Sequence, residues 1–117
     1  MNQLSKNEIY QEIGKIISQF NNLECDLCAK AITKWLNFHQ IPSKILKLRT
    51  KRANDFFIIS DRFSPNESIT DNGIHYGVEI DGIVFDNLSL EGITRSEWEK
   101  DFSCRSGGFI IDELEYL

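Results

Sequence analysis

The sequence predicts an α+β domain, with two helices packed on an antiparallel sheet of about five strands. Apolar residues recur at helical spacing through residues 6–36, and the spacing changes to that of strands from Ile45 onward. Further along, Asp81-Gly82 separates two apolar strand patterns, as expected for a tight hairpin turn. Because helices and strands occupy different parts of the chain, a sheet with alternating helices is not expected.

Length, charge and cysteine content limit the classes of protein to which this chain can belong. The 117 residues are expected to form one domain, 1–117, because so short a chain cannot supply two cores. The net charge is −5 and no apolar run reaches the ~20 residues that span a bilayer, so neither nucleic acid nor a membrane is an expected partner. Three cysteines and no visible signal peptide favour a reducing compartment, the cytoplasm of the producing cell, and no cofactor is expected.

The first helix is predicted from Lys6 to about Gln19. Ser5 and Glu8 have the spacing of a capping box, in which each side chain bonds the backbone N–H of the other residue. The buried stripe follows at Ile9, Ile13, Ile16, Ile17 and Phe20.

The second helix is predicted to start near Glu24 and to end before Pro42. Cys25 lies in its first turn, where unpaired N–H groups and the helix dipole favour a thiolate. Cys28 lies one turn deeper on the stripe that includes Ile32 and Trp35, where a thiol commonly serves as a small apolar filler.

The remaining segments predict the other strands and a short helix. Ile45–Leu48 and Gly107–Ile111 have the pattern of strands, and Phe56–Ser60 is expected to be a well-buried strand. Residues 61–71 are polar and contain Pro65, which predicts a surface loop. A Thr94-x-x-Glu97 capping box followed by Trp98 predicts a short helix laid across the sheet.

Residues 72–87 are predicted to form the hairpin around which the site is built. With Asp81-Gly82 as a type I′ turn, Val78 faces Phe85 across the two strands. His75 and Asp86 are then diagonal neighbours on one face, with Cβ atoms roughly 7 Å apart. An imidazole oriented by a carboxylate is half of a nucleophilic site. The opposite face is expected to enter the core with Tyr76, Val78, Phe85, Phe57, Ile59, Trp35 and Ile32.

Several motifs together resemble the papain-fold toxins, in particular the second such family of bacterial polymorphic toxin systems. They are Glu24-Cys25-Asp26-Leu27-Cys28, Asn72-Gly73-x-His75-Tyr76-Gly77, Val84-Phe85-Asp86-Asn87 and Glu97-Trp98. The resemblance implies a minimal papain-like domain with a Cys-His-Asp/Asn site. It also implies action on proteins of a target cell to which the toxin is delivered, and a cognate immunity protein as partner.

Mapped onto this sequence, the resemblance makes either Cys25 or Cys28 the nucleophile. The place of Cys25 at the start of the helix favours Cys25, with Cys28 in reserve. His75 becomes the base and Asp86 the residue that orients it, with Asn87 in reserve. Gln19 precedes Cys25 by the spacing at which papain-like enzymes place their oxyanion-hole glutamine, whereas Asn22 holds that spacing before Cys28.

The implied chemistry is acyl transfer from a protein amide, as a protease, a glutamine deamidase or a transglutaminase. Two other classes of function stay open on the sequence. One is a catalytically inactive binding module on the same fold. The other is a zinc or redox module that uses Cys25, Cys28, His75 and Cys104, although Cys104 lacks a second ligand at paired spacing.

Overall fold

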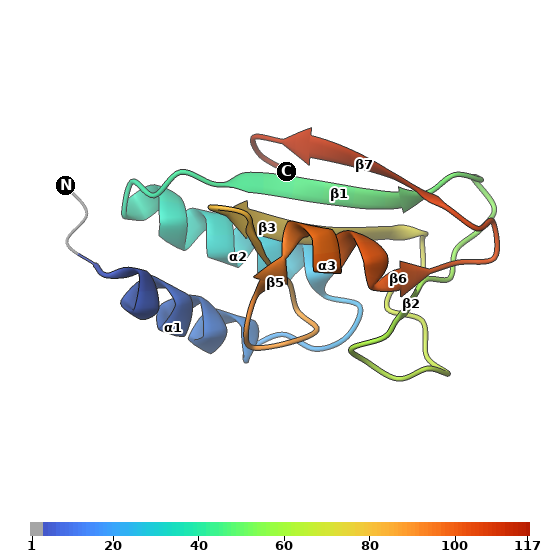
Figure 1. Cartoon of the computed structure of the whole chain (residues 1–117), viewed down its shortest axis with the longest axis horizontal. Helices are drawn as coiled ribbons and strands as arrows, with labels where there is room; N and C mark the ends of the chain where they lie inside the picture. The colour runs from blue at the N-terminus through green and yellow to red at the C-terminus, as the bar shows by residue number, and fades with distance from the viewer. Residues whose placement is uncertain (1–3) are drawn as a thin grey trace.

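The computed structural model describes residues 4–117, and it has the predicted α+β architecture (Figure 1). The helices are α1 (Lys6–Ile17), α2 (Cys25–Phe38) and α3 (Arg95–Lys100). The strands are β1 (Lys44–Thr50), β2 (Ile59–Ser60), β3 (Ile74–Ile80), β4 (Ile83–Phe85), β5 (Ile93–Thr94), β6 (Phe102–Ser103) and β7 (Phe109–Leu114). Within the described residues, no helix combines the length and the apolar character needed to cross a membrane.

Five strands form one antiparallel sheet in the order β5-β4-β3-β1-β7, and β2 pairs with β6 in a separate two-stranded sheet. The two long central strands, β1 and β3, pair from Lys44 opposite Glu79 to Arg49 opposite Ile74. The predicted hairpin register is confirmed, since Val78 of β3 lies opposite Phe85, the last residue of β4.

The hairpin turn has the backbone conformation that its sequence demands. Asp81 has φ 51° and Gly82 has φ 81°, as a type I′ turn requires at both central positions. At the chain's start, Ser5 and Glu8 make both bonds of the predicted capping box, each 3.2 Å long. The first helix ends two residues before the predicted Gln19, which lies in the following turn.

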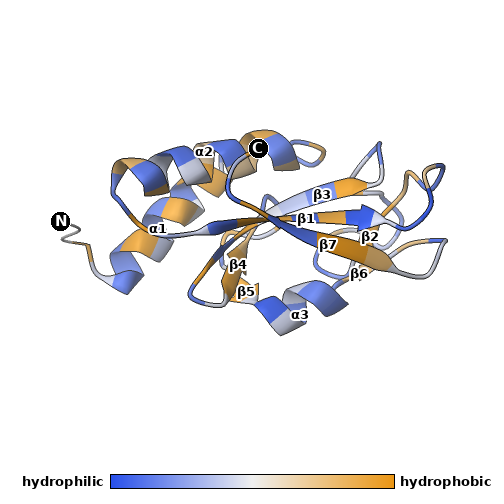
Figure 2. Cartoon of the chain, turned by 90° about the horizontal axis from the view of Figure 1, so that it is seen from above, coloured by the Kyte–Doolittle hydropathy of each residue, from blue (hydrophilic) through white to orange (hydrophobic). Residues whose placement is uncertain are grey.

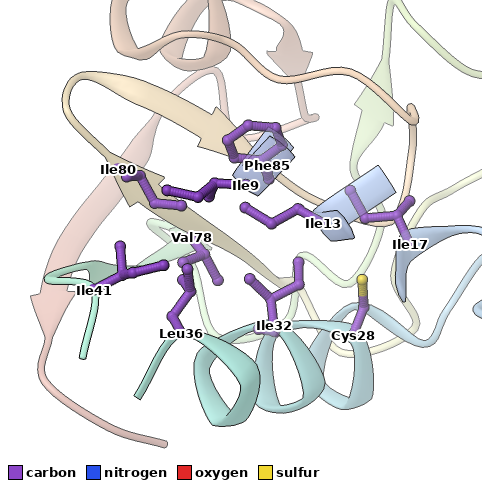
Figure 3. Close-up of a cluster of buried hydrophobic side chains, with 11 residues drawn as sticks. Ile9, Ile13, Ile17, Cys28, Ile32, Leu36, Ile41, Val78, Ile80 and Phe85 are labelled. Atoms are coloured by element: carbon purple, nitrogen blue, oxygen red, sulfur yellow. The ribbon is translucent and has the colours of Figure 1, made fainter. Parts of the chain in front are cut away.

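Helices cover both faces of the sheet, α1 and α2 on one side and α3 on the other (Figure 2). The larger core lies between the sheet and the first two helices, and Ile13, Ile32, Val78 and Phe85 converge there (Figure 3). A second core forms on the opposite face, under α3 and the loops. Its members are Leu46, Leu48, Ile58, Ile69, Val84, Trp98 and Phe102.

The prediction of a well-buried strand at Phe56–Ser60 is wrong. Only Ile59 and Ser60 are strand, and they pair with β6 outside the main sheet. Phe56 and Phe57 are 48% and 69% exposed, so Phe57 does not enter the core, and Ile59 is only half-buried. The apolar run does not become a central strand because β3 and β7 already occupy both edges of β1.

Candidate active site

His75 and Asp86 meet on the face of the hairpin that α3 covers. Nε2 of His75 lies 3.0 Å from Oδ2 of Asp86, and neither side chain is exposed to solvent. The histidine comes from β3 and the aspartate follows β4, so the contact arises from the register of the hairpin. The diagonal pair that the sequence predicts is therefore formed.

Besides His75, three residues donate hydrogen bonds to Asp86. Arg62 donates two bonds, Nη1 to Oδ1 at 3.0 Å and Nη2 to Oδ2 at 2.7 Å. Trp98 Nε1 donates to Oδ2 at 2.9 Å, and the backbone N–H of Leu88 donates to Oδ1 at 3.1 Å. Burial raises the pKa of Asp86, but bonds from His75 and Arg62 outweigh it and hold that pKa well below its usual range. The carboxylate therefore stays ionised.

The same contacts favour the protonated form of His75. Burial lowers the pKa of this imidazole, but the bond to Asp86 and the interaction with Cys25 more than offset burial and raise the pKa to about 9. Asp86 occupies Nε2, and Nδ1 is buried without an ordinary hydrogen-bond partner. We conclude that Nδ1 is the ring nitrogen available to the Cys25 sulfur.

The two cysteines of the pair lie in different environments. Cys25 is the first residue of α2, is 7% exposed and lines a pocket of about 380 Å³. Its sulfur lies 4.0 Å from the carbonyl oxygen of Ile74, next to His75 in the chain. Cys28 is fully buried in the core (Figure 3), and burial with the charges of Asp86, Cys25 and Glu24 raises the pKa of its thiol to about 12. Cys28 is therefore a neutral core residue.

The pocket beside Cys25 lies between the start of α2 and the loop that leads into β3. Thr70 and Asn72 contribute from the loop, and Tyr76 contributes from the strand. The N-cap residue Glu24 makes no side-chain capping bond to the helix. The first N–H groups of α2 are thus left to bond an oxygen atom of a ligand.

The other predicted site residues lie around this centre. Gln19 is exposed on the turn after α1 and is not among the residues that line the pocket. Asn22 Nδ2 donates to the carbonyl of Ser68 at 3.0 Å. Asn87 Nδ2 donates to the carbonyl of Asn21 at 2.9 Å, so Asn87 braces the loop before α2 while Asp86 contacts the imidazole.

Arg62 and Asp101 are site residues that the sequence analysis missed. Arg62 follows β2 within a polar loop, and Asp101 follows α3, so neither belongs to a periodic pattern or a motif. Arg62 bonds both Asp86 and Asp101, which lie 24 and 39 residues away in the sequence, too far for spacing to reveal the contacts. The tryptophan of the Glu97-Trp98 motif offered a signal for α3, but its bond to Asp86 depends on how that helix crosses the sheet.

The zinc ligand set considered from the sequence is not assembled. Among residues 4–117, no three His, Cys, Asp or Glu side chains gather where they could hold a metal ion. Cys104 lies between β6 and β7, where its sulfur contacts Ser106 Oγ at 3.3 Å and the carbonyl of Gly108 at 3.4 Å. Cys25, Cys28 and Cys104 are all free thiols.

Two helices before an antiparallel sheet, with a cysteine opening the second helix and a His-Asp pair on the sheet, define a papain-like domain. The chain belongs to the papain fold toxin 2 family, whose model matches residues 8–103. That match includes α1 from its third residue, all of α2, the hairpin of β3 and β4, and α3. Comparisons with curated proteins and with solved structures gave no match.

Proposed function

We propose that this protein is a toxin-type papain-like cysteine hydrolase that acts on protein amide bonds through Cys25, His75 and Asp86. The observation that carries the proposal is the placement of the His75 ring. Its Nε2 is bonded to Asp86, while Cys25 interacts with the same ring from the start of α2. A nucleophile, a base and a residue that orients the base are thus adjacent.

In the first step, the Cys25 thiolate attacks the carbonyl carbon of the substrate amide. The carbon–nitrogen bond breaks, the departing nitrogen takes the proton from Nδ1 of His75, and a thioester remains on Cys25. In the second step, Nδ1 takes a proton from water, the resulting hydroxide attacks the thioester, and the carbon–sulfur bond breaks. The thiolate and the imidazolium are then restored.

The negative charge on the substrate oxygen needs donors in both steps. The first-turn N–H groups of α2 supply them beside the sulfur, since Glu24 does not cap that turn. Gln19 is proposed as a side-chain donor, which requires it to turn inward from its exposed position. Replacing Gln19 by Ala is expected to lower kcat more than it raises KM.

The acceptor of the acyl group and the position of the amide define the reaction. Water with a backbone amide gives proteolysis, and water with a glutamine side chain gives deamidation. A primary amine as acceptor gives transamidation. As a toxin, the enzyme would act on a protein of a target cell to which it is delivered, and a cognate immunity protein would block the pocket beside Cys25.

The proposal is tested by incubating the purified protein with a defined mixture of denatured proteins, with and without a fluorescent primary amine. Mass spectrometry separates the three reactions as new termini, glutamine converted to glutamate, or amine incorporated. Cys25→Ser and His75→Ala are expected to abolish the product, whereas Cys28→Ala retains it. A peptide-like vinyl sulfone, an electrophile that traps thiolates, is expected to label Cys25.

No product and no labelling at Cys25, in protein shown to be folded, would contradict the hydrolase. The protein would then be a binding module on a papain-like fold. Product that survives Cys25→Ser but is lost with Cys28→Ala would keep the enzyme class and move the nucleophile.

A further inference from the structure

Arg62 is a nearly buried arginine that bridges two carboxylates behind the His75 ring. Its side chain is 16% exposed. Besides the two bonds to Asp86, Nε donates to Asp101 Oδ2 at 3.0 Å and Nη1 donates to Ser89 Oγ at 2.8 Å. The guanidinium also lies 5.9 Å from the ring centroid of Phe102. All three guanidinium nitrogens of Arg62 therefore donate hydrogen bonds.

Asp101 keeps the guanidinium in this position. It accepts a bond from the hydroxyl of Ser60, which belongs to β2, while Asp101 itself lies between α3 and β6. The small two-stranded sheet thus anchors one carboxylate, and Arg62 transmits that anchoring to Asp86. Planar bidentate pairing of this kind fixes the orientation of a carboxylate as well as its charge.

The role of Arg62 depends on which charges surround His75. His75 faces the negative charge of Asp86 directly, and Cys25 from α2 on its other side. Cys28 is neutral, and Asp101 is one residue further away, behind Arg62. An unopposed buried carboxylate would hold the imidazolium proton very tightly, and a general acid that cannot release its proton is a poor catalyst.

We propose that Arg62 is a positioning residue of the active site, which orients Asp86 toward His75 and offsets part of its charge so that the imidazolium can release its proton. This inference rests on the proposed function and deepens it. It assigns the loop after β2 a part in the chemistry, although Arg62 does not touch the pocket beside Cys25. If Arg62 only braced the fold, its replacement would change stability and leave the pKa of His75 unchanged.

The test is an NMR titration of the His75 ring in the absence of substrate. The chain has two histidines, so a His39→Gln background leaves His75 as the one ring signal. In this background we compare Arg62→Lys, which keeps the charge but loses the fork, with the double variant Arg62→Met/Asp101→Asn. The double variant removes one cation and one anion together, so Asp101 does not remain as a charge without its partner, and Asp86 keeps its contacts with His75 and Trp98.

The matched control is Arg95→Met. Arg95 also bonds several carboxylates, Glu79, Glu99 and Glu113, but none of them is Asp86, the carboxylate that contacts His75. Its loss tests whether removing any ion-paired arginine shifts the titration.

We expect the double variant to raise the pKa of His75 by about one pH unit or more, because the cation that is bonded to Asp86 is lost. Arg62→Lys should give a smaller rise, and Arg95→Met none. An unchanged or lowered His75 pKa in the double variant overturns the proposal, and if that variant does not fold, the absence of any rise in Arg62→Lys does so. Because no substrate is needed, these results are independent of whether amide hydrolysis is found.

Discussion

The indole of Trp98 occupies the space that a side chain at residue 77 would need. A Cβ atom added to Gly77 would lie 3.1 Å from Cζ2 of Trp98 and 2.8 Å from Cγ1 of Val84. Because residue 77 has no side chain, the indole of Trp98 can pack directly against the sheet. Its Nε1 lies 2.9 Å from Oδ2 of Asp86. Gly77 follows His75 by two residues on the same face of β3, and the position of the indole explains why residue 77 has no side chain.

Gly77→Ala is expected to destabilise the protein by about 1–3 kcal/mol, the usual cost of overpacking a dense core. Trp98 would have to move away from Asp86, so its fluorescence should change as well. Chemical denaturation measures the loss. As a comparison, Trp98→Phe removes the bond to Asp86 without adding volume. Equal stability of Gly77→Ala and the parent protein would show that α3 packs more loosely than described.

Cys25 is expected to react first with iodoacetamide at pH 6. The reason is its interaction with a His75 ring that is protonated at that pH, together with its place in the lining of a pocket. Peptide mass spectrometry of the alkylated protein gives the order of reaction of the three cysteines. Cys28 should lag strongly, because burial raises the pKa of its thiol to about 12.

His75→Ala should slow the alkylation of Cys25 at pH 6 by removing the imidazolium, and Asn87→Ala should have a smaller effect. Cys28→Ala is the matched control, since it removes the neighbouring sulfur and leaves the His75 contact in place. If Cys28 were modified before Cys25 in folded protein, the assignment of the nucleophile would have to be reversed.

The raised pKa of His75 predicts a loss of stability at alkaline pH. The pKa is about 9 in the folded protein and about 6.5 in the unfolded chain, so the folded state binds the proton more tightly. This contribution is fully present below pH 6.5 and is lost as the pH rises to about 9 and beyond. We expect the free energy of unfolding to fall by about 2–3 kcal/mol between pH 6 and pH 10.

The measurement is urea denaturation across that range of pH, repeated with His75→Gln, which cannot titrate. The variant should show a much flatter profile. A parent profile as flat as that of the variant would mean that the His75 pKa is ordinary.

Two phenylalanines provide a direct test of the core. Phe85 is 1% exposed between α1 and the sheet, whereas Phe57 is 69% exposed. Phe85→Ala is expected to cost about 3–5 kcal/mol, and Phe57→Ala less than about 0.5 kcal/mol. Thermal or urea unfolding of the two variants measures the difference. Similar losses for both would place Phe57 in the core, as the sequence pattern suggested.

Local patterns were sufficient for the helices and the hairpin. The capping boxes at Ser5 and Thr94 act over three residues, and the Asp81-Gly82 turn sets the register of β3 and β4 by its own geometry. These interactions involve neighbours in the chain, so they can be recognised without tertiary structure. The meeting of His75 and Asp86 follows from the same register.

The sequence pattern gave a wrong prediction where segments far apart in the chain compete to pair with the same strand. Phe56–Ser60 has the composition of a buried strand, but only its last two residues pair, because the edges of β1 are filled by β3 and by β7 from the far end of the chain. Both strands bond to β1 through contacts of long sequence separation, which local propensity does not register.

By itself, the sequence determined an α+β domain with Cys25 at the start of a helix and a His75-Asp86 pair on one face of a hairpin. The sequence placed Cys28 on the buried stripe of that helix, but only the tertiary structure showed that Cys28 is fully enclosed, and that Arg62 and Trp98 hold Asp86 in place. The physical reason is one of range. Capping and turn bonds act between near neighbours, whereas desolvation and buried ion pairs depend on which distant segments enclose a side chain.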